Sequence, residues 1–126
     1  MKMKFTSTDK APAALGPYSQ AVSVNGLLFT SGQIALDPAT GEIVGSDVQA
    51  QAEQVCKNLA AVLEANCLTF TDAVKTTCFL ADMGDFAAFN EVYGKYFTGK
   101  PARSCVAVKT LPKNVLCEVE VIAEMK

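Results

Sequence analysis

The stretch Leu116-Cys117-Glu118-Val119-Glu120-Val121-Ile122-Ala123-Glu124-Met125 alternates between two kinds of side chain. A period of two is typical of a β-strand with one buried face. One face carries Leu116, Ile122 and the three glutamates, and the other is uniformly apolar: Cys117, Val119, Val121, Ala123 and Met125. We expect the apolar face to pack on helices and the glutamates to point away from them.

Two helices are predicted upstream of this strand. Apolar residues recur at helical spacing from Val48 to about Asn66. At the start of this helix, Ser46 is followed three residues later by Gln49, a pair that resembles a capping box. Asp82 and Asp85 can cap a second helix. Its spaced apolar and aromatic residues are Phe86, Phe89, Val92, Tyr93 and Tyr96.

The other strands complete an α+β pattern. Asn25-Gly26 lies between two short apolar runs and predicts a hairpin with a type I′ turn. Residues 73–81 are apolar on both faces, and residues 104–110 form a further predicted strand. The chain is therefore expected to form a single domain over residues 1–126, with about six strands in one sheet and two helices packed on one face.

The sheet is expected to be apolar on both faces, because neighbouring residues of its strands, such as Leu28 and Phe29, are both hydrophobic. Two helices cover only one face, so a second subunit is expected to bury the other. The alternative is an exposed face with scattered hydrophobic residues, which is ordinary for a monomer.

Composition excludes several classes of function. The 126 residues carry a net charge of −2 with scattered lysines, so no nucleic-acid partner is expected. No segment is long and apolar enough for a signal or membrane span, and no membrane partner is expected. The chain has five cysteines without a close pair and no histidine, which argues against a metal site and a disulfide framework. Free thiols favour the cytoplasm.

Arg103 is the leading candidate for chemistry, in the segment Pro101-Ala102-Arg103-Ser104-Cys105-Val106. A guanidinium on a sheet face needs a carboxylate or a bound anion. If residues 104–110 and 116–125 form a hairpin, Glu118 or Glu120 reaches Arg103. A glutamate then either neutralises the arginine, or positions water or moves a proton while Arg103 anchors a substrate carboxylate.

Two further segments carry weaker signals. Gly16-Pro17-Tyr18-Ser19-Gln20 is a rigid turn that delivers Tyr18, either as a packing residue or as a ligand contact. In Thr30-Ser31-Gly32-Gln33, Gly32 permits close approach of a ligand and Ser31 offers a hydroxyl, but a bulge explains both residues equally well.

Taken together, five segments closely resemble the RidA (YjgF/YER057c/UK114) family and cover nearly the whole chain in order: Gly16–Gln20, Thr30–Ile34, Val74–Thr77, Pro101–Val106 and Glu118–Ala123. The resemblance implies a chorismate-mutase-like α+β fold. It also implies a homotrimer in which the sheets line a central barrel and ligand clefts lie between subunits.

The resemblance further implies hydrolysis of reactive enamines and imines, namely 2-aminoacrylate and 2-aminocrotonate with their imine tautomers, to 2-keto acids and ammonia. Carried over by motif, Arg103 clamps the substrate carboxylate and Glu118 holds the attacking water. Tyr18 and Ser31 line the cleft, and backbone groups around Gly32 and Cys105 bind the ligand. Ser104 joins this substrate-binding set, and Asn90 supports the subunit contacts.

No cofactor is expected, because an imine is already electrophilic and needs neither a metal nor pyridoxal phosphate. Cys105 is interpreted as a small packing thiol, since the chain offers no imidazole to activate it. An alternative function is a trimer that binds keto acids for regulation without turnover. An endoribonuclease is a third reading, disfavoured by the acidic composition.

The chain departs from the family pattern at two places. The segment Phe97-Thr98-Gly99-Lys100 is shorter than in many relatives, which could widen the cleft. Cys67 stands where relatives often have glycine, and Asn66 is expected to take the left-handed cap instead.

Overall fold

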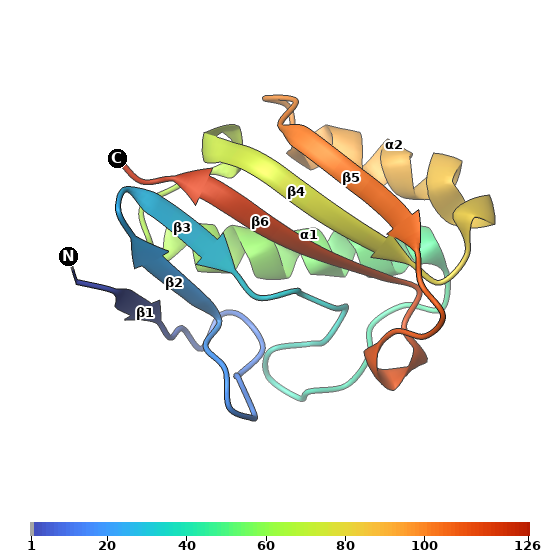
Figure 1. Ribbon diagram of the computed structural model, residues 1–126. Helices are drawn as coiled ribbons and strands as arrows, with labels where there is room; N and C mark the ends of the chain where they lie inside the picture. Colours follow the sequence, from blue (N-terminus) through green and yellow to red (C-terminus); the bar gives the residue numbers. More distant parts are fainter. Residues whose placement is uncertain (1) are drawn as a thin grey trace.

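The computed structural model describes residues 2–126, and these residues form a six-stranded sheet with two α-helices on one face (Figure 1). The strands are β1 (Lys4–Thr6), β2 (Ala21–Val24), β3 (Leu27–Thr30), β4 (Ala73–Leu80), β5 (Ala102–Ala107) and β6 (Cys117–Glu124), and the helices are α1 (Val48–Glu64) and α2 (Phe86–Tyr96). Their order across the sheet is β1-β2-β3-β6-β4-β5. The α+β prediction is confirmed.

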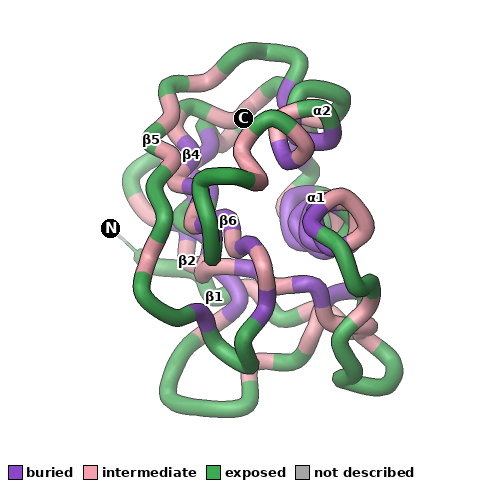
Figure 2. Tube along the Cα trace, turned by 90° about the vertical axis from the view of Figure 1, so that its right-hand side faces the viewer, coloured by how far each residue is buried: buried purple, intermediate pink, exposed green. Residues whose placement is uncertain are grey.

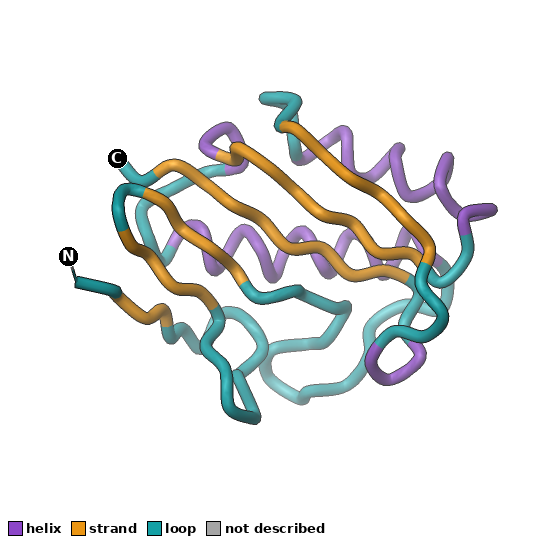
Figure 3. The backbone as a smooth tube through the Cα atoms, viewed as in Figure 1, coloured by secondary structure: helices purple, strands orange, loops and turns teal. Residues whose placement is uncertain are grey.

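The sheet is antiparallel except at one edge. β4 and β5 run parallel, whereas β6 lies antiparallel between β3 and β4, as the arrows in Figure 1 show. The chain passes from β4 to β5 through α2 (Figure 3). A strand–helix–strand unit of this kind places its helix on one face of the sheet. β5 lies at the edge of the sheet. It begins at Ala102, two residues earlier than predicted.

The core lies between the sheet and the helices. On β6, Cys117, Val119, Val121 and Ala123 are buried, while the residues between them are half-buried or exposed. The buried parts of the sheet and of α1 face each other in Figure 2. This matches the alternation in the sequence, because burial of the apolar face against helices is the main stabilising term.

The β2–β3 hairpin turns at Asn25 and Gly26, whose φ angles are 57° and 80°. Both angles lie in the left-handed region, as the predicted type I′ turn requires. The hairpin prediction is confirmed.

The two helix ends correct two details of the prediction. Asp47, not Ser46, is the N-cap of α1, and its carboxylate accepts a hydrogen bond from the Ala50 amide at 2.8 Å. After α1, Cys67 itself takes the left-handed conformation, with φ 61°. Asn66 is not the left-handed residue; its side chain instead donates to the Val62 carbonyl at 2.9 Å.

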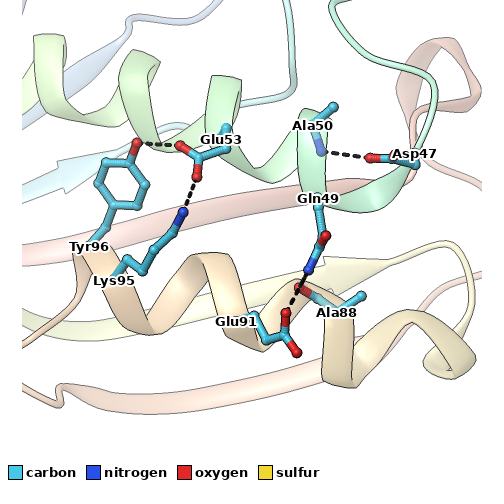
Figure 4. A network of polar contacts seen from close by, with 8 residues as sticks. All are labelled: Asp47, Gln49, Ala50, Glu53, Ala88, Glu91, Lys95 and Tyr96. Atoms are coloured by element: carbon cyan, nitrogen blue, oxygen red, sulfur yellow. Dashed lines mark hydrogen bonds and ion pairs between the residues drawn. The ribbon is translucent and has the colours of Figure 1, made fainter.

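Polar contacts connect the exposed sides of the two helices (Figure 4). Glu53 of α1 accepts from Lys95 and from the Tyr96 hydroxyl of α2. Gln49 donates to Glu91 at 2.9 Å and to the Ala88 carbonyl at 3.1 Å. These bonds fix how α2, which faces β5, is placed against α1.

The other face of the sheet is open in the single chain. Phe29 and Val106 are 40% and 46% exposed there, and Phe79 and Ile122 are half-buried. Glu118, Glu120 and Glu124 share this face, as their alternation predicted. Within residues 2–126, no helix has the length and hydropathy needed to cross a membrane.

Candidate active site

Arg103 projects from β5 toward α2, where three side chains of that helix hold its guanidinium. Nη1 donates to Oδ1 of Asn90 at 2.6 Å. The guanidinium carbon lies 4.6 Å from the centre of the Tyr93 ring and 5.3 Å from that of Phe86. Contact with aromatic rings stabilises a cation and fixes the plane of the guanidinium.

Tyr93 is itself held from two sides. Its hydroxyl shares a 2.6 Å hydrogen bond with Thr76 of β4, and its ring stacks on Phe97 with centroids 4.4 Å apart. Burial raises the pKa of Tyr93, so its hydroxyl stays protonated at neutral pH. The support beneath Arg103 is therefore rigid and uncharged.

Arg103 has no carboxylate partner among the described residues, whose ion pairs are Lys95–Glu53 and Lys126–Asp72. A guanidinium has five N–H donors. Among residues 2–126, Asn90 is the one side chain that accepts a hydrogen bond from Arg103. Arg103 borders a pocket of about 680 Å³ and is the only arginine in the sequence. Arg103, Asn90 and Tyr93 are together called the Arg103 half-site. The guanidinium N–H groups that do not bind Asn90 are available to an anion.

Glu118 lies on the opposite, open face of the sheet, in a second pocket of about 530 Å³ that also contains Tyr18, Ser31 and Gly32. These four residues are called the Glu118 half-site. They meet because Gln33 and Val119 exchange backbone hydrogen bonds, Gln33 N to Val119 O at 2.8 Å and Val119 N to Gln33 O at 3.2 Å. This bridge places Gly32 directly beside the Glu118 side chain.

Gly32 is needed because the Glu118 carboxyl occupies the space of a side chain. A Cβ at position 32 would lie 2.1 Å from Oε2 of Glu118 and 2.8 Å from its Cδ. The sequence prediction assigned this space to a ligand or a bulge, whereas in the structure it seats the carboxyl group. Burial raises the pKa of Glu118, and the neighbouring Glu120 raises it further.

Ser31 and Gln20 shape the wall that carries Tyr18. The Ser31 hydroxyl donates to the Ser19 carbonyl at 2.6 Å, so its proton is committed to the backbone. Gln20, buried, donates to the carbonyls of Thr8 and Pro12, both at 2.9 Å. Tyr18 stays 56% exposed beside this wall. Sequence reasoning missed Gln20, whose position before the hairpin strand carries no chemical signal.

The topology separates the two half-sites within one chain, which corrects the predicted hairpin of residues 104–110 and 116–125. β4 lies between β5 and β6. Arg103 is in register with the buried Thr76 on the helix side, whereas Glu118 is in register with Phe79 on the open side. Neither Glu118 nor Glu120 can therefore neutralise Arg103 of the same chain.

Ser104 and Cys105 follow Arg103 on opposite faces of β5. Ser104 is exposed on the open face, and Cys105 is half-buried on the helix side in register with Cys78. Burial raises the pKa of Cys105, although Arg103 lowers it somewhat. A thiol that stays protonated is a poor nucleophile, which agrees with a packing role. Among residues 2–126, no group of three or more acidic or cysteine side chains is arranged to hold a metal ion.

Asn90 was predicted to support subunit contacts, and in the structure it binds Arg103 of its own chain. Phe86, Asn90 and Tyr93 are spaced by four and three residues on α2, so they share one helix face. That spacing is a signal from which the support of Arg103 could have been predicted.

Comparison with known proteins gives consistent matches over nearly the whole chain. A family model described as endoribonuclease L-PSP matches residues 8–125. The RutC family protein slr0709 of Synechocystis is 54% identical over 126 residues, covering 98% of this chain and 97% of the relative. The mouse 2-iminobutanoate/2-iminopropanoate deaminase is 49% identical over 121 residues, covering 95% and 90%.

Among solved structures, Escherichia coli TdcF with bound serine superposes with a TM-score of 0.92 at 45% identity, covering 98% of this chain and 99% of TdcF. Sequence and fold therefore agree over nearly the whole chain. The chain belongs to the RidA family, as its motifs indicated.

Proposed function

We propose that this protein hydrolyses 2-aminoacrylate, 2-aminocrotonate and their imine tautomers to 2-keto acids and ammonia, as a cytoplasmic homotrimer with a cleft at each subunit boundary. The observation that carries the proposal is the Arg103 half-site. Its guanidinium is held by Asn90 and Tyr93, faces a pocket and has no carboxylate among the described residues. This arrangement suits bidentate binding of a substrate carboxylate.

Glu118 supplies the second function. Its raised pKa favours a carboxyl group that gives a proton to the imine nitrogen and then takes one from water. Water adds to the C=N carbon, and the resulting carbinolamine breaks its C–N bond. One water is consumed, and one 2-keto acid and one ammonia are released. Tyr18 and Ser31 line this side of the cleft.

The separation of the two half-sites supports an assembly in which neighbouring copies share each cleft. Arg103 lies on the helix side at the β5 edge, and Glu118 lies on the open face, so one substrate meets both groups only if two copies contribute. The partly exposed Phe29 and Val106 on the open face support burial by further copies. Free thiols at all five cysteines support the cytoplasm.

A direct test generates 2-aminoacrylate with a pyridoxal-phosphate dehydratase and follows keto-acid release with semicarbazide as a competing trap. Wild type is expected to accelerate release, Arg103→Ala to abolish the effect, and Arg103→Lys to retain little of it because an ammonium lacks the bidentate geometry. Lys109→Ala, which changes an exposed lysine just after β5, is the control. Unaltered activity in Arg103→Lys would refute the carboxylate clamp.

The alternative function is binding of keto or amino acids without turnover. The bound serine named for TdcF favours small carboxylates as ligands of this family. If a trimeric preparation fails to accelerate keto-acid release but binds 2-oxobutanoate in an Arg103-dependent manner, the binding function replaces the deaminase.

A further inference from the structure

The turn Pro112-Lys113-Asn114 places an exposed lysine at the border of the Glu118 half-site, and its backbone is unusual. Lys113 and Asn114 both have φ of 55°, so two successive non-glycine residues are left-handed. Asparagine tolerates this conformation, but lysine gains nothing from it. The buried residues Leu111 and Val115 on either side hold the turn in place. Strain maintained in this way is often found at functional sites.

Lys113 borders the same pocket of about 530 Å³ as Glu118, Tyr18 and Gly32. The other residues that line this pocket are uncharged, so the pocket contains one carboxyl group and one ammonium group. In the described part of the chain Lys113 has no ion-pair partner.

An unpaired ammonium at the mouth of a pocket attracts an anion, and Arg103 already accounts for one substrate carboxylate. The pocket, at about 530 Å³, lies within the volume range of small-molecule sites. We infer that the cleft accepts 2-imino acids with a second carboxylate at the end of the side chain, and that Lys113 is the residue that binds this carboxylate. The inference rests on the proposed function and names a wider substrate class for it.

The chemistry of such substrates identifies their source. Elimination from serine, threonine or cysteine yields only short, singly charged enamines. A dicarboxylic imine instead requires a two-electron oxidation of an amino acid at its Cα–N bond, with loss of two hydrogens to an acceptor such as flavin. Hydrolysis then proceeds as above, with one water consumed and one ammonia released. The reaction class that supplies these substrates is therefore amino-acid oxidation.

The test compares 2-oxoglutarate with 2-oxobutanoate as probes in titration calorimetry, and the matching imines, made in situ by amino-acid oxidases, in turnover assays. The variant is Lys113→Gly, which removes the ammonium and also accepts the left-handed backbone, so it is expected to fold. Lys113→Arg keeps the charge. Cys67→Gly is the matched backbone control, because it makes the same relief of a left-handed residue at the end of α1.

Lys113→Gly is expected to weaken binding of 2-oxoglutarate about fivefold and to change 2-oxobutanoate binding less than twofold, with Lys113→Arg close to wild type. The same ratio is expected in kcat/KM for the two imines. Equal losses for both probes, or no loss for either, would overturn the role of Lys113. Failure of the proposed function has a different signature: no turnover of either imine while the calorimetric selectivity for 2-oxoglutarate persists.

Discussion

Replacement of Gly32 by alanine is expected to displace the Glu118 carboxyl group while leaving the glutamate itself in place. The new Cβ would lie 2.1 Å from Oε2, whereas an ordinary contact is at least 3.4 Å, so the carboxyl must shift by about 1.3 Å. Gly32 does not have a left-handed φ, so alanine adds no backbone strain there. The carboxyl is the far end of a flexible side chain and yields by rotation. A shift of this size at a catalytic group costs about 100-fold in rate.

The assay measures kcat and KM for 2-aminoacrylate hydrolysis together with thermal unfolding. We expect kcat to fall about 100-fold and KM to change little, because Arg103 supplies the carboxylate contact. An altered Glu118 rotamer costs about 0.5–1.5 kcal/mol, so the melting temperature is expected to fall by no more than about 6 °C. Gly99→Ala is the control, since its Cβ meets nothing closer than 3.5 Å.

A Gly32→Ala variant with the kcat of wild type would refute the assignment of Glu118 as the group that handles water and proton. A higher KM with an unchanged kcat would instead assign Glu118 to ligand binding and not to catalysis. Light scattering on each variant checks that the assembly is retained.

Three other perturbations test separate parts of the structure. Glu118→Gln is expected to be at least as stable as wild type at pH 7, because the pKa of Glu118 is raised in the folded state and its ionised form lowers stability above that pKa. In urea titrations, the difference in free energy of unfolding between variant and wild type should disappear below pH 4.5. Cys67→Gly should raise the free energy of unfolding by about 0.5–1 kcal/mol, because it removes a left-handed cysteine at some cost in chain entropy; an unchanged urea midpoint contradicts this. Phenylglyoxal should modify one arginine per chain and abolish turnover, with protection by 2-oxobutanoate, as followed by mass spectrometry.

Local patterns in the sequence predicted the elements well. The alternation in residues 116–125, the Asn25-Gly26 turn and the helical spacing after Val48 all correspond to observed elements. These signals are strong because each depends on neighbours along the chain. The N-cap at Asp47 was missed because two acceptable capping residues are adjacent, and tertiary packing selects between them.

Strand pairing could not be predicted in the same way. Residues 102–107 and 117–124 are close in sequence and suggest a hairpin, but β5 pairs with β4 because the intervening α2 carries it back parallel. Both Arg103 and Glu118 border pockets, but the prediction that they lie close together in one chain was wrong. The contact between Gly32 and Glu118 was also beyond prediction, since it joins residues 86 positions apart through the bridge at Gln33.

The two half-sites differ in how much of the chain they require. Arg103 and its supports belong to one continuous stretch, from β4 through α2 to β5, whereas Glu118 meets Tyr18 and Gly32 only when distant segments join. The wall at Tyr18 depends on side-chain hydrogen bonds from Ser31 and Gln20 to loop carbonyls, and such bonds open more easily than a packed helix. On gentle heating or in dilute urea, turnover should therefore be lost while the carboxylate receptor stays intact, so that the protein passes through a state that captures its ligand and no longer converts it.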